Sequence, residues 1–158
     1  MSASKSNRAE AAARARPHAS TSFLVDFGSG DPRAEGAGFS EVVFPTFPVE
    51  RPNGDDVTLP ARGTADAGAA ASPHLILRRG VTGALDLYQW WNKARRGKAP
   101  QRRVVKIMLL DDDLESIVWT WRFRNVRPVS LTYSPLRSMM PAILVETLEL
   151  AFDEVEIS

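Results

Sequence analysis

The chain has 158 residues, of which 44% are hydrophobic and 25% charged, a composition typical of a soluble globular protein with one buried core. It contains no cysteine, which excludes thiol nucleophiles, disulfides and metal sites with cysteine ligands. The formal net charge is only +1, which argues against the strongly basic surface typical of a nucleic-acid-binding domain.

The segment 1–22 is rich in Ala, Ser and Arg and has no large apolar residue after Met1. Such a segment buries too little apolar surface to order itself. We predict a basic tail that is disordered or becomes ordered on assembly, followed by one domain over 23–158. No stretch of the sequence has the 18 or more apolar residues of a membrane span, so no membrane insertion is expected.

Two short strands are predicted before residue 50. The first covers 23–27, where apolar side chains alternate with others, and glycines follow it. The second covers 38–44 and ends at Pro45. Pro45 and Pro48 cannot donate ladder hydrogen bonds, so this strand should be short.

The segment 49–72 is dominated by Pro, Gly, Asp and Ala, and we predict a long loop. Loops of this length are usually functional or disordered. Its side chains with apolar or charged groups are the candidate contacts: Arg51, Asp55, Asp56, Val57 and Leu59. A short strand over 74–79 follows the loop.

One helix is predicted, over 83–96, with Thr82 as its cap and Gly97 just past its end. Three large side chains share one face and are predicted to pack the helix onto the outside of a barrel: Leu87, Tyr88 and Trp91.

The remainder of the chain reads as β structure. A strand over 103–110 is followed by a turn at 111–113, and apolar residues then alternate from Ile117 onward. The strand is expected to continue past Pro128, which should lie at an edge or bulge. A last strand is predicted over 143–152. Glu146 lies at one of its alternate positions that are otherwise apolar, which conflicts with the pattern.

These elements predict a mainly β (α+β) fold, a small barrel or sandwich of six to seven antiparallel strands with one helix outside. Polar residues of two strands have the parity opposite to the apolar residues and could face water in a channel or the outer surface: Arg122, Arg124, Thr147 and Glu149.

No motif for catalysis, a metal or a cofactor is present. His18 and His74 lack metal-ligand spacing. The acidic run 111–113 favours a solvated turn over a cation site. Trp90 and Trp91 precede several cations, but helix packing explains the pair better than nucleic-acid binding.

Short segments in unbroken order over about 23–155 resemble the tube-protein family of contractile phage tails and related injection systems. They are Gly38-Phe39-Ser40-Glu41-Val42, Leu59-Pro60, Leu77-Arg78-Arg79-Gly80-Val81-Thr82, Leu87-Tyr88-Gln89-Trp90-Trp91, 121–128 and 145–151. The resemblance implies a structural subunit without enzymatic activity or cofactors, whose hexameric rings stack into a tube.

Further expectations follow from this resemblance. The partners would be the chain itself, a sheath protein and baseplate or tube-initiator proteins, with protein cargo or DNA possible in the lumen. The subunit would assemble in the cytoplasm as a component of a phage tail or injection particle. By its position, the loop 49–72 would make the contacts between rings, with Val57 and Leu59 as apolar anchors.

Three alternatives remain open at the level of sequence. The prolines at 45 and 48 and the long tail are also compatible with a tube-initiator or minor tube paralogue at the baseplate. A monomeric β-barrel binding module is a second possibility. A metal-dependent enzyme using the acidic run 111–113 is the third.

Overall fold

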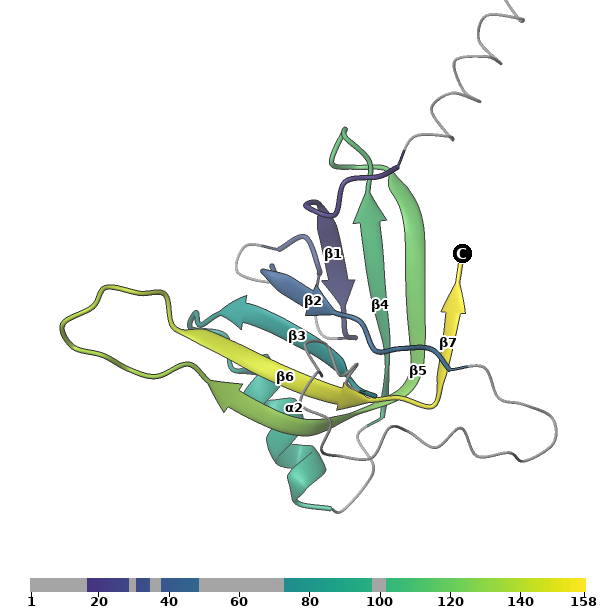
Figure 1. Ribbon diagram of the computed structural model, residues 1–158. Coiled ribbons are helices and arrows are strands. Elements are labelled where there is room, and N and C mark those ends of the chain that lie inside the picture. The colour runs from purple at the N-terminus through teal and green to yellow at the C-terminus, as the bar shows by residue number, and fades with distance from the viewer. Residues whose placement is uncertain (1–16, 29–30, 35–37, 49–72, 98–101) are drawn as a thin grey trace, which may run out of the picture.

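The computed structural model describes residues 17–28, 31–34, 38–48, 73–97 and 102–158 (Figure 1). The described residues form seven strands and one helix: β1 (Phe23–Asp26), β2 (Glu41–Val43), β3 (Leu75–Gly80), α2 (Asp86–Arg95), β4 (Arg103–Leu110), β5 (Ile117–Tyr133), β6 (Val145–Ala151) and β7 (Glu154–Ile157). The predicted fold class, mainly antiparallel β with one helix, is confirmed.

Neighbouring strands are antiparallel, in the order β1-β4-β5-β6-β3-β2, and β7 pairs with β5. The long strand β5 belongs to two halves of this sheet. Its first part pairs with β4 and β7, which with β1 make up the β4 half-sheet. Its second part pairs with β6, which with β3 and β2 makes up the β6 half-sheet. The two half-sheets run in clearly different directions (Figure 1).

Local backbone features of β5 explain this change of direction. Asn125, two residues before the part that pairs with β6, has φ of 53°, a left-handed conformation that asparagine tolerates better than most residues. A register shift follows between Pro128 and Ser130, as expected for a proline in a strand. The predicted continuation of the strand past Pro128, with a bulge, is therefore confirmed.

The core lies between the two half-sheets, where every second side chain points inward. It consists of aliphatic and aromatic residues from both halves and from α2: Val25, Phe27, Leu75, Leu77, Leu87, Trp90, Val105, Ile107, Phe123, Val126, Leu148 and Leu150. Burying each of the large apolar side chains contributes about 1.5–3 kcal/mol to the free energy of folding, so the positions of these residues in the sequence favour this fold.

The ends of some elements differ from the prediction. The helix begins at Asp86, and no described side chain caps it, because Thr82 Oγ1 accepts a hydrogen bond from Ala84 N instead. Gly97 has φ of 69° just past the helix, as predicted. β2 ends at Val43, ahead of Pro45. The separate strand β7 was not predicted, because its four residues are mostly exposed and carry little pattern.

Candidate functional site

An exposed apolar projection connects β5 to β6, and we name its residues 134–144 the apolar arm (Figure 1). Its large apolar side chains are in contact with water: Leu136 is 84% exposed, Met139 90%, Met140 62% and Ile143 79%. Four large apolar side chains exposed within one short segment are unusual, and exposed apolar patches mark interaction sites in soluble proteins.

The base of the apolar arm is fixed to the sheet. Ser134 N donates to Val145 O at 2.9 Å, and Val145 N donates to Ser134 Oγ at 2.9 Å. Val81 N donates to Leu144 O at 2.8 Å, which ties the returning strand to the end of β3. Both ends of the arm are therefore held at the sheet.

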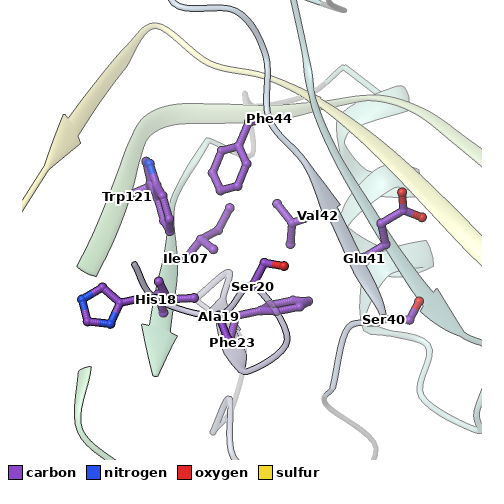
Figure 2. Close-up of a pocket in the computed structure, with 11 residues that line it drawn as sticks. His18, Ala19, Ser20, Phe23, Ser40, Glu41, Val42, Phe44, Ile107 and Trp121 are labelled. Carbon is purple, nitrogen blue, oxygen red and sulfur yellow. The ribbon is translucent and has the colours of Figure 1, made fainter. Parts of the chain in front are cut away.

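A second feature is a pocket of about 340 Å³ where the edge strands β1 and β2 approach without pairing, and we name it the edge pocket (Figure 2). Its apolar lining comes from four strands and the residue after β2: Phe23, Val42, Phe44, Ile107, Leu109 and Trp121. The rings of Phe44 and Trp121 lie 4.6 Å apart. His18, Ala19 and Ser20 lie along another side of the pocket.

A buried ion-pair network joins the helix to the β6 half-sheet. Arg79, at the inner side of β3, is 1% exposed. Its Nε donates to Glu146 Oε1 at 2.6 Å, and its Nη2 pairs with Asp86 Oδ1 at the first turn of α2. The guanidinium also lies 5.4 Å from the centre of the Phe39 ring. Glu146, the polar residue that conflicted with the pattern of its strand, is thus a partner of a buried arginine.

The charges in this network stabilise one another. Burial alone would raise the pKa of Asp86, but the hydrogen bond and charge of Arg79 outweigh it and hold the pKa below its usual value. Burial likewise would lower the pKa of Arg79, whereas Asp86 and Glu146 raise it. Both side chains remain charged at neutral pH.

The helix presents a different tryptophan to the core than predicted. Leu87 is buried as expected, but Tyr88 is 43% exposed and Trp91 is half-buried, so their predicted core packing is wrong. Trp90 is fully buried instead, stacked on Phe27 at 6.2 Å, with the Arg103 guanidinium 4.6 Å from its ring.

The ion pair explains which face turns inward. Asp86 must face Arg79, and at 3.6 residues per turn Trp90 projects between Asp86 and Leu87. Trp91 is displaced by about a quarter turn from this face and contacts Tyr88 and Arg95 at the surface. Because Trp90 is buried, it is not available to stack on a nucleic-acid base.

The four residues predicted to face either a channel or the outer surface divide between two faces. Arg122 and Arg124 lie on the outer face of the β4 half-sheet, where Arg124 pairs with Glu156 at 3.2 Å. Thr147 and Glu149 lie on the outer face of the β6 half-sheet, where Glu149 accepts a hydrogen bond from Ser130 Oγ and pairs with His74.

The remaining predicted contacts cannot be placed. Arg51, Asp55, Asp56, Val57 and Leu59 all belong to 49–72, which lies outside the described residues. Sequence reasoning in turn missed the apolar arm. Its signal was the group Leu136, Met139, Met140 and Ile143. Ile143 was predicted to begin the last strand, but β6 begins at Val145 and Ile143 is exposed.

The acidic run 111–113 forms the predicted turn between β4 and β5. Asp113 Oδ1 accepts hydrogen bonds from the backbone nitrogens of Glu115 and Ser116, both at 2.8 Å. Hydrogen bonds from Ser116 lower the pKa of Asp113. Within the part of the chain that the structure describes, no group of three or more His, Asp or Glu could hold a metal ion, and no helix is long and apolar enough to span a membrane.

Comparison with known proteins was made at the level of sequence and of fold. The family model described as T4-like virus tail tube protein gp19 matches residues 19–156. No curated protein matches the sequence significantly.

Several solved structures have the same fold. A tube-terminating cap of the anti-feeding prophage has a TM-score of 0.65 and 19% identity, over 90% of this chain and 91% of that one. A chain of the sheath-tube complex of the extracellular contractile injection system PVC has a TM-score of 0.65 and 20% identity, over 94% of this chain and 96% of that one. A chain of the anti-feeding prophage baseplate has a TM-score of 0.59 and 22% identity, over 91% of this chain and 97% of that one.

Proposed function

The chain belongs to the T4-like virus tail tube protein family, and from this premise we propose that it forms hexameric rings that stack into the inner tube of a contractile injection system. The family match over residues 19–156 carries the proposal. The chain is accordingly a structural component of a phage tail or injection particle, and we propose that it assembles in the cytoplasm and has no catalytic activity.

The exposed apolar arm supports self-assembly, because a monomer gains nothing from four large apolar side chains in water. The unpaired outer edges of β1 and β2, among the described strands, offer backbone groups for strand addition. We propose as further partners a sheath protein and a baseplate, with which similar folds occur in solved structures. Cargo or DNA in the lumen stays a prediction.

The direct test is assembly of the purified protein. Negative-stain electron microscopy is expected to show six-fold rings and hollow tubes, and mass photometry a species of six chains. A protein that stays monomeric at high concentration would contradict the proposal and favour the monomeric binding module.

The tube-initiator paralogue is the second candidate, and the baseplate structure with the same fold favours keeping it. The two candidates differ in stacking. A bulk tube subunit forms long tubes from a single purified chain, whereas an initiator stops at one or two rings and requires another chain to extend.

The loop 49–72 gives one prediction for stacking. Replacing residues 52–70 with a short Gly/Ser linker is expected to leave the fold intact, since the sequence predicts a loop there and the described core residues lie outside it. Rings should form but not stack, because the candidate contacts Val57 and Leu59 are removed. Circular dichroism and thermal melting check the fold, and microscopy checks the tubes. Tubes of normal length would contradict the assignment of this loop to ring stacking.

The lumen gives another prediction. Because Arg124 and Thr147 lie on the outer faces of different half-sheets, only one of the two faces is expected to line the channel. We expect cysteines at the two positions to differ in assembled tubes. The lumenal one should react with a small maleimide but not with one attached to a large polymer. Equal reactivity of both positions toward both reagents would contradict a lumen lined by either face.

A further inference from the structure

We propose that the apolar arm of one subunit docks into the edge pocket of a second copy of the chain. This inference rests on the proposed function, since it names the contact through which subunits recognise one another. A projection on one surface that fits a recess on another makes a heterologous contact, which closes into a ring or continues as a stack.

The two surfaces have matching chemistry. Along residues 134–144, Leu136, Met139 and Met140 are exposed, and Arg137 carries the segment's single charge. The pocket offers aromatic and aliphatic side chains, with Phe44 and Trp121 on one side and Ile107 between them and β2 (Figure 2). Methionine side chains are flexible enough to fill an irregular apolar recess and make favourable contacts with aromatic rings.

The arm cannot occupy the pocket of its own chain. Trp121, in the pocket, and Tyr133, at the base of the arm, belong to different half-sheets on the two sides of the bend at Asn125. They are twelve positions apart along β5, which changes direction between them. The arm also projects away from β1 and β2 (Figure 1). In the proposed tube, where many copies of the chain lie side by side, a second copy is therefore the partner that occupies the pocket.

Charge favours the same pairing. Leu109 of the pocket is followed closely by the exposed turn with Asp111, Asp112, Asp113 and Glu115. Arg33 donates hydrogen bonds to Leu114 O and Glu115 O in this turn, so its four carboxylates outnumber one described cation. Leu110 N donates to Ser22 O at 2.9 Å, which keeps this turn beside the first residues of the pocket. The arm has Arg137 and no acidic residue. A cation approaching an acidic rim increases the rate of association and fixes the orientation of the partners.

Cross-linking tests the contact directly, because the chain has no native cysteine. Chains with Met139→Cys are mixed with chains carrying Ser20→Cys at the pocket, and assembled under mild oxidation. We expect a disulfide between the two different chains. A mixture of Met139→Cys with Lys93→Cys, an exposed position on α2, serves as the control and should give at most a tenth as much product.

Assembly of arm variants gives the second readout. Leu136→Asp and Met139→Asp change side chains that are 84% and 90% exposed, so the melting temperature should stay within 2 °C of the wild-type value, on the order expected for surface changes. The concentration needed for assembly should rise at least tenfold. Leu85→Asp is the matched control, since Leu85 is also an exposed leucine, at 61%, and lies outside the arm. Arg137→Glu should slow assembly most at low salt.

The outcomes separate this contact from the general function. If wild-type chains form tubes but Met139→Cys gives no excess cross-link to Ser20→Cys, the docking is wrong and the tube function stands. If the Asp variants form normal tubes but no longer bind a sheath protein, the arm has a different partner and the docking is again overturned. If wild-type chains form neither rings nor tubes, the proposed function fails, and the specific cross-link alone decides the docking.

Discussion

Trp90→Ala is expected to destabilise the fold by about 3–5 kcal/mol, the usual cost of removing a large aromatic side chain from a core. The Trp90 side chain is fully buried and stacks on Phe27. Its loss leaves a cavity under α2 and also removes the ring beneath the Arg103 guanidinium. The change should lower the melting temperature by about 6–20 °C for a domain of this size.

The neighbouring tryptophan is the matched control. Trp91 has the same side chain, one position along the same helix, but packs on Arg95 and Tyr88 at the surface. Trp91→Ala should cost only about 1 kcal/mol, in the range of exposed cation–π contacts. Thermal melting of the two variants side by side measures the difference. Equal destabilisation by both changes, or a larger effect at Trp91, would show that the helix is rotated relative to the structure.

Breaking the buried network should have an effect of similar size. Glu146→Ala leaves the Arg79 guanidinium, 1% exposed, with only Asp86 as its charged partner among the described residues. Removing one member of a buried ion pair costs about 3–5 kcal/mol, mostly because the remaining charge is desolvated without compensation. Denaturant unfolding of Glu146→Ala and Arg79→Leu measures this cost.

The control is again the adjacent residue. Arg78 points to the outer face of β3, where it pairs with Glu41 at 2.8 Å and is 38% exposed. Arg78→Leu should change stability by less than about 1 kcal/mol. The double variant Arg79→Leu with Glu146→Leu should recover part of the loss of Arg79→Leu, because the buried Glu146 carboxylate is then not left without a partner, and Asp86 is 28% exposed. A double variant less stable than both single ones would contradict this interpretation.

Acid should weaken the same network in a defined direction. The pKa of Asp86 is lower in the folded protein than its usual value of 3.8, so its contribution to stability is complete above that value. The contribution is lost as the pH falls below 3.8 and through the lower folded pKa. Asp86→Asn should therefore reduce the stability difference between pH 7 and pH 3, which urea unfolding at the two pH values measures.

Much of the fold was predictable because alternation reports burial directly. In the first part of β5, Trp121 and Phe123 face the core at alternate positions, as the pattern of the sequence predicts, and the bulge at Pro128 follows from a missing backbone donor. The rotation of α2 was not predictable in this way. Leu87, Tyr88 and Trp91 form a plausible apolar face, but an ion pair to a residue on another strand selects Trp90 instead.

The candidate site shows the same division. The polar parity of Arg124 and Thr147 was readable in the sequence, but their separation onto two faces depends on the bend at Asn125. The apolar arm was overlooked because loop composition and strand periodicity describe elements that fold within one chain. An exposed apolar segment between two strands violates both patterns, and only its exposure in the folded chain distinguishes it from a core segment.

The order of the strands in the sheet also has a consequence for how the protein is synthesised. β1 pairs only with β4 among the described strands, and β3 with β2 and β6, so strands made early pair with strands made late. At about 5–20 residues added per second, several seconds pass between the emergence of β1 and of its partner. The sheet is therefore complete only after β6 and β7 have left the ribosome, and until then the apolar strands made first lack the partners that cover them in the folded chain.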